Sequence, residues 1–181
     1  KNYIWYVSYS KDGKFLATGS ADATAKIWRT NDWSLVKKFV GHTGEVASVR
    51  FSNDGKFLLT ASDDHSVKLW NTTSFEMVRS FDDNSNTVWK AVFSQDGKVI
   101  ASSSYDGRII TWNASNGEVI HDLEGHTNQI AGLAYSKDGA CLASASDDGT
   151  LKIWDVETGV ELFELLDAGD SQIVRVSVSR G

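Results

Sequence analysis

The chain of 181 residues contains no proline and a single cysteine, Cys141. One cysteine excludes an internal disulfide and is typical of a protein from a reducing compartment. No apolar run approaches the ~20 residues that a membrane span needs, and no secretory signal peptide is visible. We therefore expect an intracellular protein, cytoplasmic or nuclear, that makes no membrane contact.

Clusters of basic residues are also missing. The chain has 18 lysines and arginines against 24 aspartates and glutamates, a formal net charge of −6, and its cations are scattered. An extended nucleic-acid footprint needs a basic face, so we expect no nucleic-acid partner. The sequence also lacks a glycine-rich phosphate loop, a cofactor fingerprint and histidines or cysteines at metal-ligand spacing. We therefore expect no cofactor, no metal and no enzymatic activity.

What the chain does contain is a repeat of 42 residues, marked by Trp28, Trp70, Trp112 and Trp154. A period of this length predicts stacked copies of one supersecondary unit. Each tryptophan follows an aspartate by six residues, and each aspartate follows a serine or threonine by four. These repeated polar residues are Asp22, Asp64, Asp106 and Asp148, with Thr18, Thr60, Ser102 and Ser144.

Short runs rich in valine, isoleucine, phenylalanine and tryptophan lie between these positions and predict strands. Each unit has four of them, and those of the second unit are Val46 to Phe51, Phe57 to Ala61, Val67 to Trp70 and Met77 to Phe81. An Asp-Gly pair lies between the first two runs of every unit and favours a hairpin, because glycine supplies the positive φ of a tight turn. No segment has a helical period of useful length. The prediction is an all-β fold.

Four strands per repeat, with Gly-His, serine or threonine, aspartate and tryptophan in that order, resemble the WD-repeat family of β-propellers. Gly-His precedes the strands in the second and fourth units, whereas Asp83-Asn84 stands there in the third. Only Trp154-Asp155 keeps the Trp-Asp pair, and the proline usual in the family's Ser-Pro-Asp-Gly turn is missing. Neither departure threatens the fold.

The resemblance implies a β-propeller of four-stranded antiparallel blades that occupies the whole chain, residues 1–181. The blades are expected at about 1–40, 41–82, 83–124 and 125–166, and the first strand of a further blade at 172–179. Four blades and one strand do not form a ring of the usual size, and open blade edges favour aggregation. We expect a segment of a larger propeller whose ring is closed by further blades or by a second copy.

The resemblance also gives the repeated polar residues a structural role. In the family, a serine or threonine hydroxyl accepts the indole N–H of a buried tryptophan, a histidine bonds the hydroxyl and an aspartate holds the histidine. The full sets are His42, Thr60, Asp64, Trp70 and His126, Ser144, Asp148, Trp154; a variant set is Asn84, Ser102, Asp106, Trp112; and Thr18, Asp22, Trp28 lack the histidine. The same residue types form hydrolase triads. Satisfaction of buried polar groups explains their recurrence in every unit.

Partner contacts in the family lie on one rim of the central channel, three and five residues after the histidine position and just before the conserved aspartate. Apart from the alanines Ala21, Ala47 and Ala131, the residues selected in this way are Tyr3, Trp5, Glu45, Asp63, Thr87, Trp89, Tyr105, Gln129 and Asp147. Trp5 and Trp89 correspond to Ala47 and Ala131 of other units, so the scaffold does not require a large ring there. Tryptophan and tyrosine are favoured in binding hot spots. The alternative is that both tryptophans fill blade interfaces.

Glu45, Asp63 and Asp147 make the same rim acidic, which would attract a basic segment, although a solvated acidic rim without a partner is the alternative. At the opposite turns, Trp33 and Phe75 occupy places where Gly117 and Gly159 occur in other units. They mark either a second contact face or caps on an outer edge strand.

The predicted function is a non-catalytic scaffold that binds a protein or peptide on the channel rim, with Trp5, Trp89 and Tyr105 as anchors. Two alternatives stay open. One is a regulatory ligand-sensing propeller attached to an enzyme such as a signalling ATPase, and the other is a propeller enzyme with a site in the channel. The sequence decides neither the identity of the partner nor the number of blades.

Overall fold

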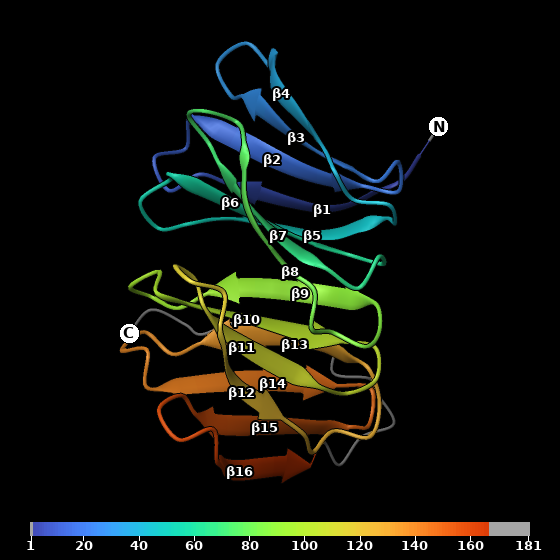
Figure 1. The fold of residues 1–181 in the computed structure, drawn as a ribbon, viewed down its shortest axis with the longest axis vertical. Helices are drawn as coiled ribbons and strands as arrows, with labels where there is room; N and C mark the ends of the chain where they lie inside the picture. Colours follow the sequence, from blue (N-terminus) through green and yellow to red (C-terminus); the bar gives the residue numbers. More distant parts are fainter. Residues whose placement is uncertain (1, 167–181) are drawn as a thin grey trace. The chain divides into compact units, whose positions relative to one another are not determined.

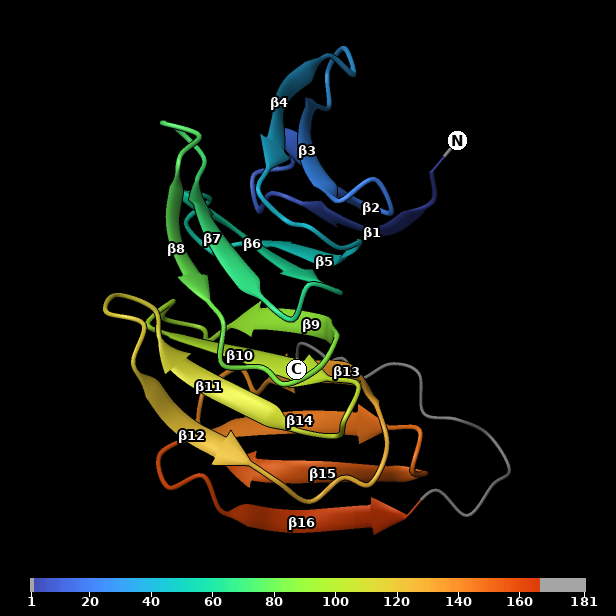
Figure 2. The same ribbon diagram turned by 45° about the vertical axis from the view of Figure 1, so that its right-hand side comes forward.

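The computed structural model describes residues 2–166, and the regular structure in this range is entirely β. Its sixteen strands form four antiparallel sheets of four strands each (Figures 1 and 2). The predicted all-β fold with four-stranded antiparallel blades is therefore confirmed. The strand expected at 172–179 lies outside the described residues. Between residues 2 and 166 there is no helix long and apolar enough to cross a membrane.

Each sheet, called a blade here, is built from four consecutive strands that are neighbours in the sheet. Blade 1 contains β1 (Ile4–Tyr9), β2 (Phe15–Ser20), β3 (Thr24–Arg29) and β4 (Leu35–Val40). Blade 2 contains β5 (Val46–Phe51), β6 (Phe57–Ser62), β7 (Val67–Asn71) and β8 (Met77–Phe81). Blade 3 contains β9 (Val88–Phe93), β10 (Val99–Ser104), β11 (Ile109–Asn113) and β12 (Val119–Leu123). Blade 4 contains β13 (Ile130–Tyr135), β14 (Cys141–Ser146), β15 (Thr150–Asp155) and β16 (Glu161–Leu166).

The chain divides into two compact units. Unit 1 is Lys1–Ala91 and holds blades 1 and 2 together with the start of β9. Unit 2 is Val92–Gly181 and holds the rest of blade 3 and blade 4.

The Asp-Gly turns close the first hairpin of each blade without proline. In blade 2, Gly55 has a φ of 72°, and its N–H donates to the Ser52 carbonyl at 2.9 Å. The Ser52 hydroxyl donates to Asp54 at 2.6 Å and accepts the Phe57 N–H at 3.0 Å. Equivalent serine–aspartate bonds are made by Ser10, Ser94 and Ser136. Because these bonds fix the turn, the preset φ that a proline would supply is not required.

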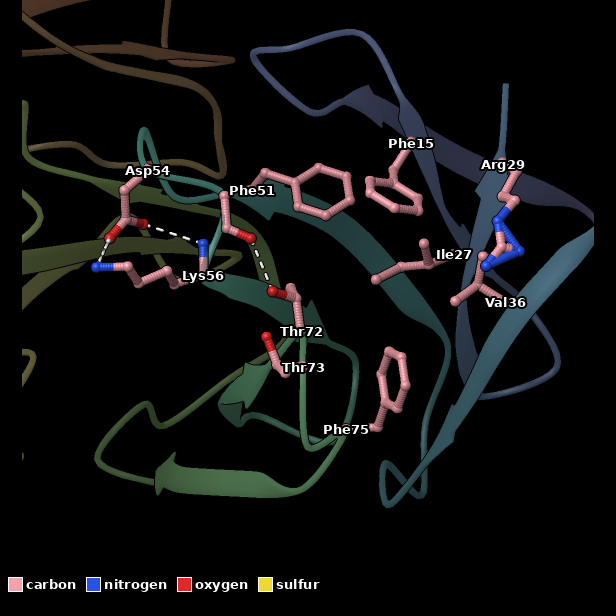
Figure 3. A pocket seen from close by; sticks show the side chains of 11 residues that line it. Phe15, Ile27, Arg29, Val36, Phe51, Asp54, Lys56, Thr72, Thr73 and Phe75 are labelled. Carbon is pink, nitrogen blue, oxygen red and sulfur yellow. Dashed lines mark hydrogen bonds and ion pairs between the residues drawn. The ribbon is translucent and has the colours of Figure 1, made fainter. Parts of the chain in front are cut away.

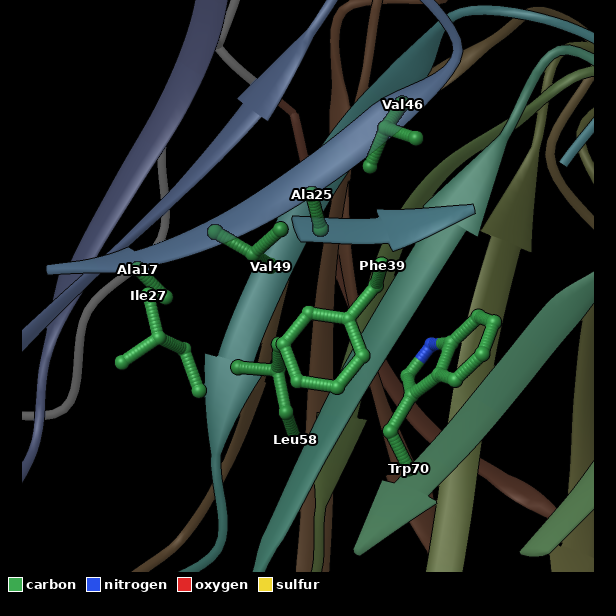
Figure 4. Close-up of a cluster of buried hydrophobic side chains, with 8 residues drawn as sticks. All are labelled: Ala17, Ala25, Ile27, Phe39, Val46, Val49, Leu58 and Trp70. Atoms are coloured by element: carbon green, nitrogen blue, oxygen red, sulfur yellow. The ribbon is translucent and has the colours of Figure 1, made fainter. Parts of the chain in front are cut away.

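The core of unit 1 lies between its two blades (Figure 4). Its buried side chains are Ala17, Ala25, Ile27, Phe39, Val46, Val49, Leu58 and Trp70. The Phe39 ring of β4 lies 5.3 Å from the Trp70 ring of β7, centroid to centroid. A Cβ at Gly19 would come within 2.8 Å of the Val46 carbonyl oxygen, so glycine permits the close approach of β2 and β5. Blade 2 thus buries one face against blade 1.

Unit 2 has a corresponding core, formed by Val92, Ala101, Ile109, Leu123, Ile130, Leu133, Leu142 and Trp154. In blade 1 the matching face is open instead. Ile4, Val7 and Tyr9 are about half exposed, whereas Val46 and Val49, the register equivalents of Ile4 and Val7 in blade 2, are fully buried in the core of unit 1. In blade 2 the corresponding face lies on β5 and is covered by blade 1.

Candidate functional site

The polar set of blade 2 forms a hydrogen-bonded chain under the tryptophan. The Trp70 indole N–H donates to Thr60 Oγ1 at 2.9 Å. His42 contacts the same hydroxyl through Nε2 at 2.7 Å and Asp64 Oδ2 through Nδ1 at 2.8 Å. An indole can only donate and an ionised carboxylate can only accept. The Thr60 hydroxyl therefore donates to Nε2, and Nδ1 carries the proton that His42 donates to Asp64.

Blade 4 repeats this arrangement. Trp154 Nε1 donates to Ser144 Oγ at 2.8 Å, and His126 lies 2.7 Å from Ser144 Oγ and 2.9 Å from Asp148 Oδ2. Burial lowers the pKa of His126, because the charged form is disfavoured away from water. Burial alone would raise the pKa of Asp148, but hydrogen bonds from Thr150, from the Thr127 backbone and from His126 lower it to about 2. The result is a neutral histidine on an ionised aspartate.

The other two sets differ in detail. In blade 1, the Trp28 indole N–H donates to Thr18 at 3.1 Å, and Asp22 binds Lys26 Nζ at 3.0 Å. In the variant set, Asn84, Ser102 and Trp112 are all buried, and Asp106 accepts the Ser104 hydroxyl. Asn84 belongs to unit 1 and the other three to unit 2.

These sets offer no reachable nucleophile. Thr60 and Ser144 are 0% exposed, and each hydroxyl is bonded to an indole and to an imidazole. A nucleophile must touch its substrate, so this arrangement can hold a tryptophan but cannot attack a bound molecule. Within residues 2–166, no three histidine, cysteine, aspartate or glutamate side chains are grouped to hold a metal ion.

The predicted binding residues lie in pairs, joined by backbone hydrogen bonds. The Asp63 N–H donates to the Glu45 carbonyl at 3.0 Å, and the Asp147 N–H donates to the Gln129 carbonyl at 3.0 Å. In blade 1 the Tyr3 carbonyl accepts the N–H of Ala21 at 2.9 Å. These bonds bring the segment before the first strand of a blade to the turn between its second and third strands.

In unit 1, Tyr3, Trp5, Glu45 and Asp63 form an aromatic and acidic patch, called the rim patch here. Tyr3 is 75% exposed and Trp5 48% exposed, with ring centroids 5.9 Å apart. Trp5 Nε1 donates to Glu45 Oε2 at 2.6 Å. This hydrogen bond connects the indole ring of blade 1 to blade 2. Partial burial, followed by the charges of Glu45 and Asp64, raises the pKa of Asp63. Like charges are therefore held together here at a cost to the folded state.

The remaining predicted residues differ in exposure. Tyr105 of unit 2 is 51% exposed. Gln129 donates through its side-chain amide to the Asp147 carboxylate, so these two side chains bind each other. Thr87 and Trp89 are half-buried, and the Trp89 indole N–H is enclosed with no acceptor among the residues that the structure describes. Of the predicted anchors, Trp5 and Tyr105 are accessible, and Trp89 is much less so.

Sequence reasoning missed a stack of cations on Tyr6 in unit 1. Lys90 Nζ lies 3.9 Å from the centre of the Tyr6 ring. The guanidinium carbon of Arg50 lies 5.1 Å from the ring centre, and Arg50 also donates a hydrogen bond to the Tyr6 hydroxyl at 2.6 Å. Tyr6 corresponds in register to Ser48 and Lys90. The sequence could have indicated this contact, because Tyr6 is aromatic where these equivalents are not.

Four segments of the chain match the sequence model of the WD domain, G-beta repeat: residues 1–29, 33–71, 75–113 and 117–155. Each contains one of the four tryptophans of the repeat. The chain therefore belongs to the WD-repeat family, whose members generally act as protein-interaction scaffolds.

One curated relative is the WD repeat-containing protein WDS homolog of Arabidopsis thaliana. It is 53% identical to the chain over 32 residues, which are 18% of this chain and 6% of that protein. The matched part is thus a small fraction of the relative's length.

Proposed function

We propose that the chain is a non-catalytic scaffold that binds a basic peptide segment on the rim patch. The observation that carries this proposal is the exposed Trp5 ring, held by Glu45 and lying beside Tyr3 and Asp63. A lysine or arginine is attracted both by an aromatic face and by carboxylates. The patch offers both within one unit.

Each side chain has a distinct role in this proposal. Glu45 orients the Trp5 indole through a hydrogen bond at 2.6 Å, so the ring is ordered before the partner arrives. Asp63 makes no side-chain hydrogen bond to another described residue and is close enough to Glu45 for their charges to repel. A bound cation would relieve that repulsion. Tyr3 provides a second aromatic face beside the first.

The test uses fluorescence anisotropy with a fluorescein-labelled octapeptide of alternating arginine and glycine. Trp5→Ala should weaken binding about tenfold, because truncation of an aromatic hot spot commonly costs more than 1 kcal/mol. The matched control is Trp33→Ala, since Trp33 is 58% exposed and lies in the turn between β3 and β4. Unchanged affinity in the Trp5 variant, or failure of the parent chain to bind the peptide, would refute the proposal.

The other predicted contacts, Thr87, Trp89, Tyr105, Gln129 and Asp147, extend this proposal to the remaining blades. They are tested by the same peptide with Tyr105→Ala, since Tyr105 is the exposed aromatic residue of unit 2. A loss of affinity smaller than that of Trp5→Ala is expected, because Gln129 and Asp147 already bind each other and offer less charge to a partner.

The exposed apolar face of β1 supports a further proposal, that another blade covers it. Ile4 and Val7 are exposed, whereas their register equivalents are buried in the cores that contain blade 2 and blade 4, and exposed apolar patches of this kind mark interfaces. Sedimentation equilibrium of the 181-residue chain distinguishes the two sources of that blade. A dimer that Val7→Asp dissociates would identify a second copy, whereas a monomer would indicate further blades.

A further inference from the structure

A groove in unit 1 lies between blades 1 and 2, away from the rim patch (Figure 3). Its volume is about 480 Å³, which is within the range of about 300–1,000 Å³ that is usual for ligand pockets. Ile27 and Val36 line it from blade 1, and Phe51 and Phe75 from blade 2, so the walls are apolar. The groove opens at the β5–β6 and β7–β8 turns, at the ends of the strands opposite the rim patch.

Phe75 provides one wall at a conformational cost. Its φ is 61°, in the left-handed region, which is rare for a bulky residue. The register equivalents Gly117 and Gly159 have φ values of 80° and 72°, so glycine satisfies this turn elsewhere in the chain. The Phe75 ring lies 6.2 Å from the Phe39 ring, and Lys37 Nζ lies 5.6 Å from its centre. A strained aromatic in place of glycine is the kind of feature that collects at ligand sites.

Unit 2 is an internal comparison. There His121 stands in place of Lys37 and Gly159 in place of Phe75. His121 Nε2–H donates to the Glu157 carbonyl at 3.1 Å, and a Cβ at Gly159 would lie 2.8 Å from His121 Nδ1. The histidine ring therefore sits directly on the β15–β16 turn and ties β12 to it. In unit 1 the corresponding residues are Lys37 on β4 and Phe75 in the β7–β8 turn, and the groove lies beside them.

Cations predominate at the mouth of the groove. Arg29 and Lys56 line it, and Lys37 covers the Phe75 wall. Asp54 is the acidic side chain among the lining residues and lies 3.4 Å from Lys56 Nζ. An apolar groove bordered by an excess of positive charge is complementary to an apolar side chain with acidic neighbours.

We propose that this groove binds an acidic peptide segment of a partner protein, which inserts one leucine-like side chain between Phe51 and Phe75. The flanking carboxylates of the segment pair with Arg29 and Lys37. The surface differs in place and in charge from the rim patch, so this inference does not rest on the proposed function.

The experiment measures the anisotropy of a fluorescein-labelled octapeptide with one central leucine among glutamates. Two comparison peptides replace the leucine by glycine or the glutamates by lysines, and each should bind at least about tenfold more weakly. Affinity for the first peptide should fall as salt is added, because exposed charges are screened. Equal binding of the lysine peptide, or no binding of the acidic leucine peptide by the parent chain, would overturn the inference.

Two matched variants locate the site. Phe75→Gly removes the wall and introduces the residue found at this position in blades 3 and 4, so relief of the positive φ should offset part of the lost contact with Phe39, while the affinity should fall at least about tenfold. Trp33→Gly makes the same kind of change at another positive φ, 58°, outside the groove, and should leave affinity unchanged. Parental affinity in Phe75→Gly overturns the inference.

A charge reversal covers the case in which Phe75→Gly folds poorly. Arg29→Glu changes an exposed side chain and should weaken the acidic peptide several-fold, and unchanged affinity would overturn the inference. Trp5→Ala, on the rim patch, should bind the acidic peptide like the parent chain.

Discussion

Removal of the Trp70 side chain is the most informative perturbation of the scaffold. Trp70 is buried, with its ring 5.3 Å from Phe39 and against the backbone of Gly41, where a Cβ would come within 2.9 Å of the ring. Trp70→Ala should therefore lower the free energy of unfolding by about 3–5 kcal/mol, the usual loss when a large aromatic is removed from a core. Against a total stability of about 5–15 kcal/mol, such a loss brings unit 1 close to unfolding.

The loss has an apolar and a polar part, which urea titrations followed by circular dichroism can separate. Thr60→Val keeps the indole but removes its acceptor and the hydroxyl that His42 contacts. It should cost about 1–3 kcal/mol, the penalty for leaving a buried polar group without a partner. Trp33→Ala is the control, because an exposed residue outside the core should change stability by about 0.5 kcal/mol or less. A Trp70→Ala variant with the parental midpoint would refute the scaffold role of the polar sets.

Three further predictions concern charge and backbone strain. The pKa of His126 lies below its ordinary value of 6.5 in the folded chain, and that of Asp148 is lowered from 3.8 to about 2, so the unfolded state binds more protons in both ranges. Stability should be constant above pH 6.5, fall as the pH drops through the folded pKa of His126, and fall again between about pH 4 and 2; a melting temperature independent of pH from 7.5 to 5 would contradict the first step. The pKa of Asp63 is raised by burial and by Glu45, so Asp63→Asn should raise the melting temperature at pH 7 while weakening the arginine peptide, and a lower melting temperature would count against it. His65 has a φ of 69° where Gly107 and Gly149 stand in other units, so His65→Gly should stabilise the chain by up to about 1 kcal/mol; a lower urea midpoint would disprove the strain.

Most of the fold could be predicted because the pattern of apolar residues within each repeat indicates which positions are buried. The expected run from Val67 to Trp70 ends one residue before the observed β7, and Met77 to Phe81 matches β8 in full. Alternation of buried residues fixes the register of a strand, and an Asp-Gly turn fixes where it stops. Both signals lie within one blade, so sequence alone carries them.

The features that depend on contact between blades were harder to predict. Trp5 and Trp89 have the same register position, yet the first is exposed and bonded to Glu45, whereas the second has an enclosed indole N–H. The groove likewise depends on which residues face one another from two blades, Lys37 and Phe75 in unit 1 or His121 and Gly159 in unit 2. The pattern of a single repeat contains no such distances. Phe75 was a signal nonetheless, because its counterparts in blades 3 and 4 are glycines.

We propose that the buried indoles belong to the scaffold and that an exposed indole recognises the partner. Titration of the ¹⁵N-labelled chain with the arginine peptide, followed through the indole N–H signals, tests this most directly. The Trp5 signal should shift on binding, while those of Trp70 and Trp154, held by Thr60 and Ser144, should stay in place and exchange slowly with water. A stationary Trp5 signal, or shifts confined to Trp70 and Trp154, would show that Trp5 is not the recognition residue.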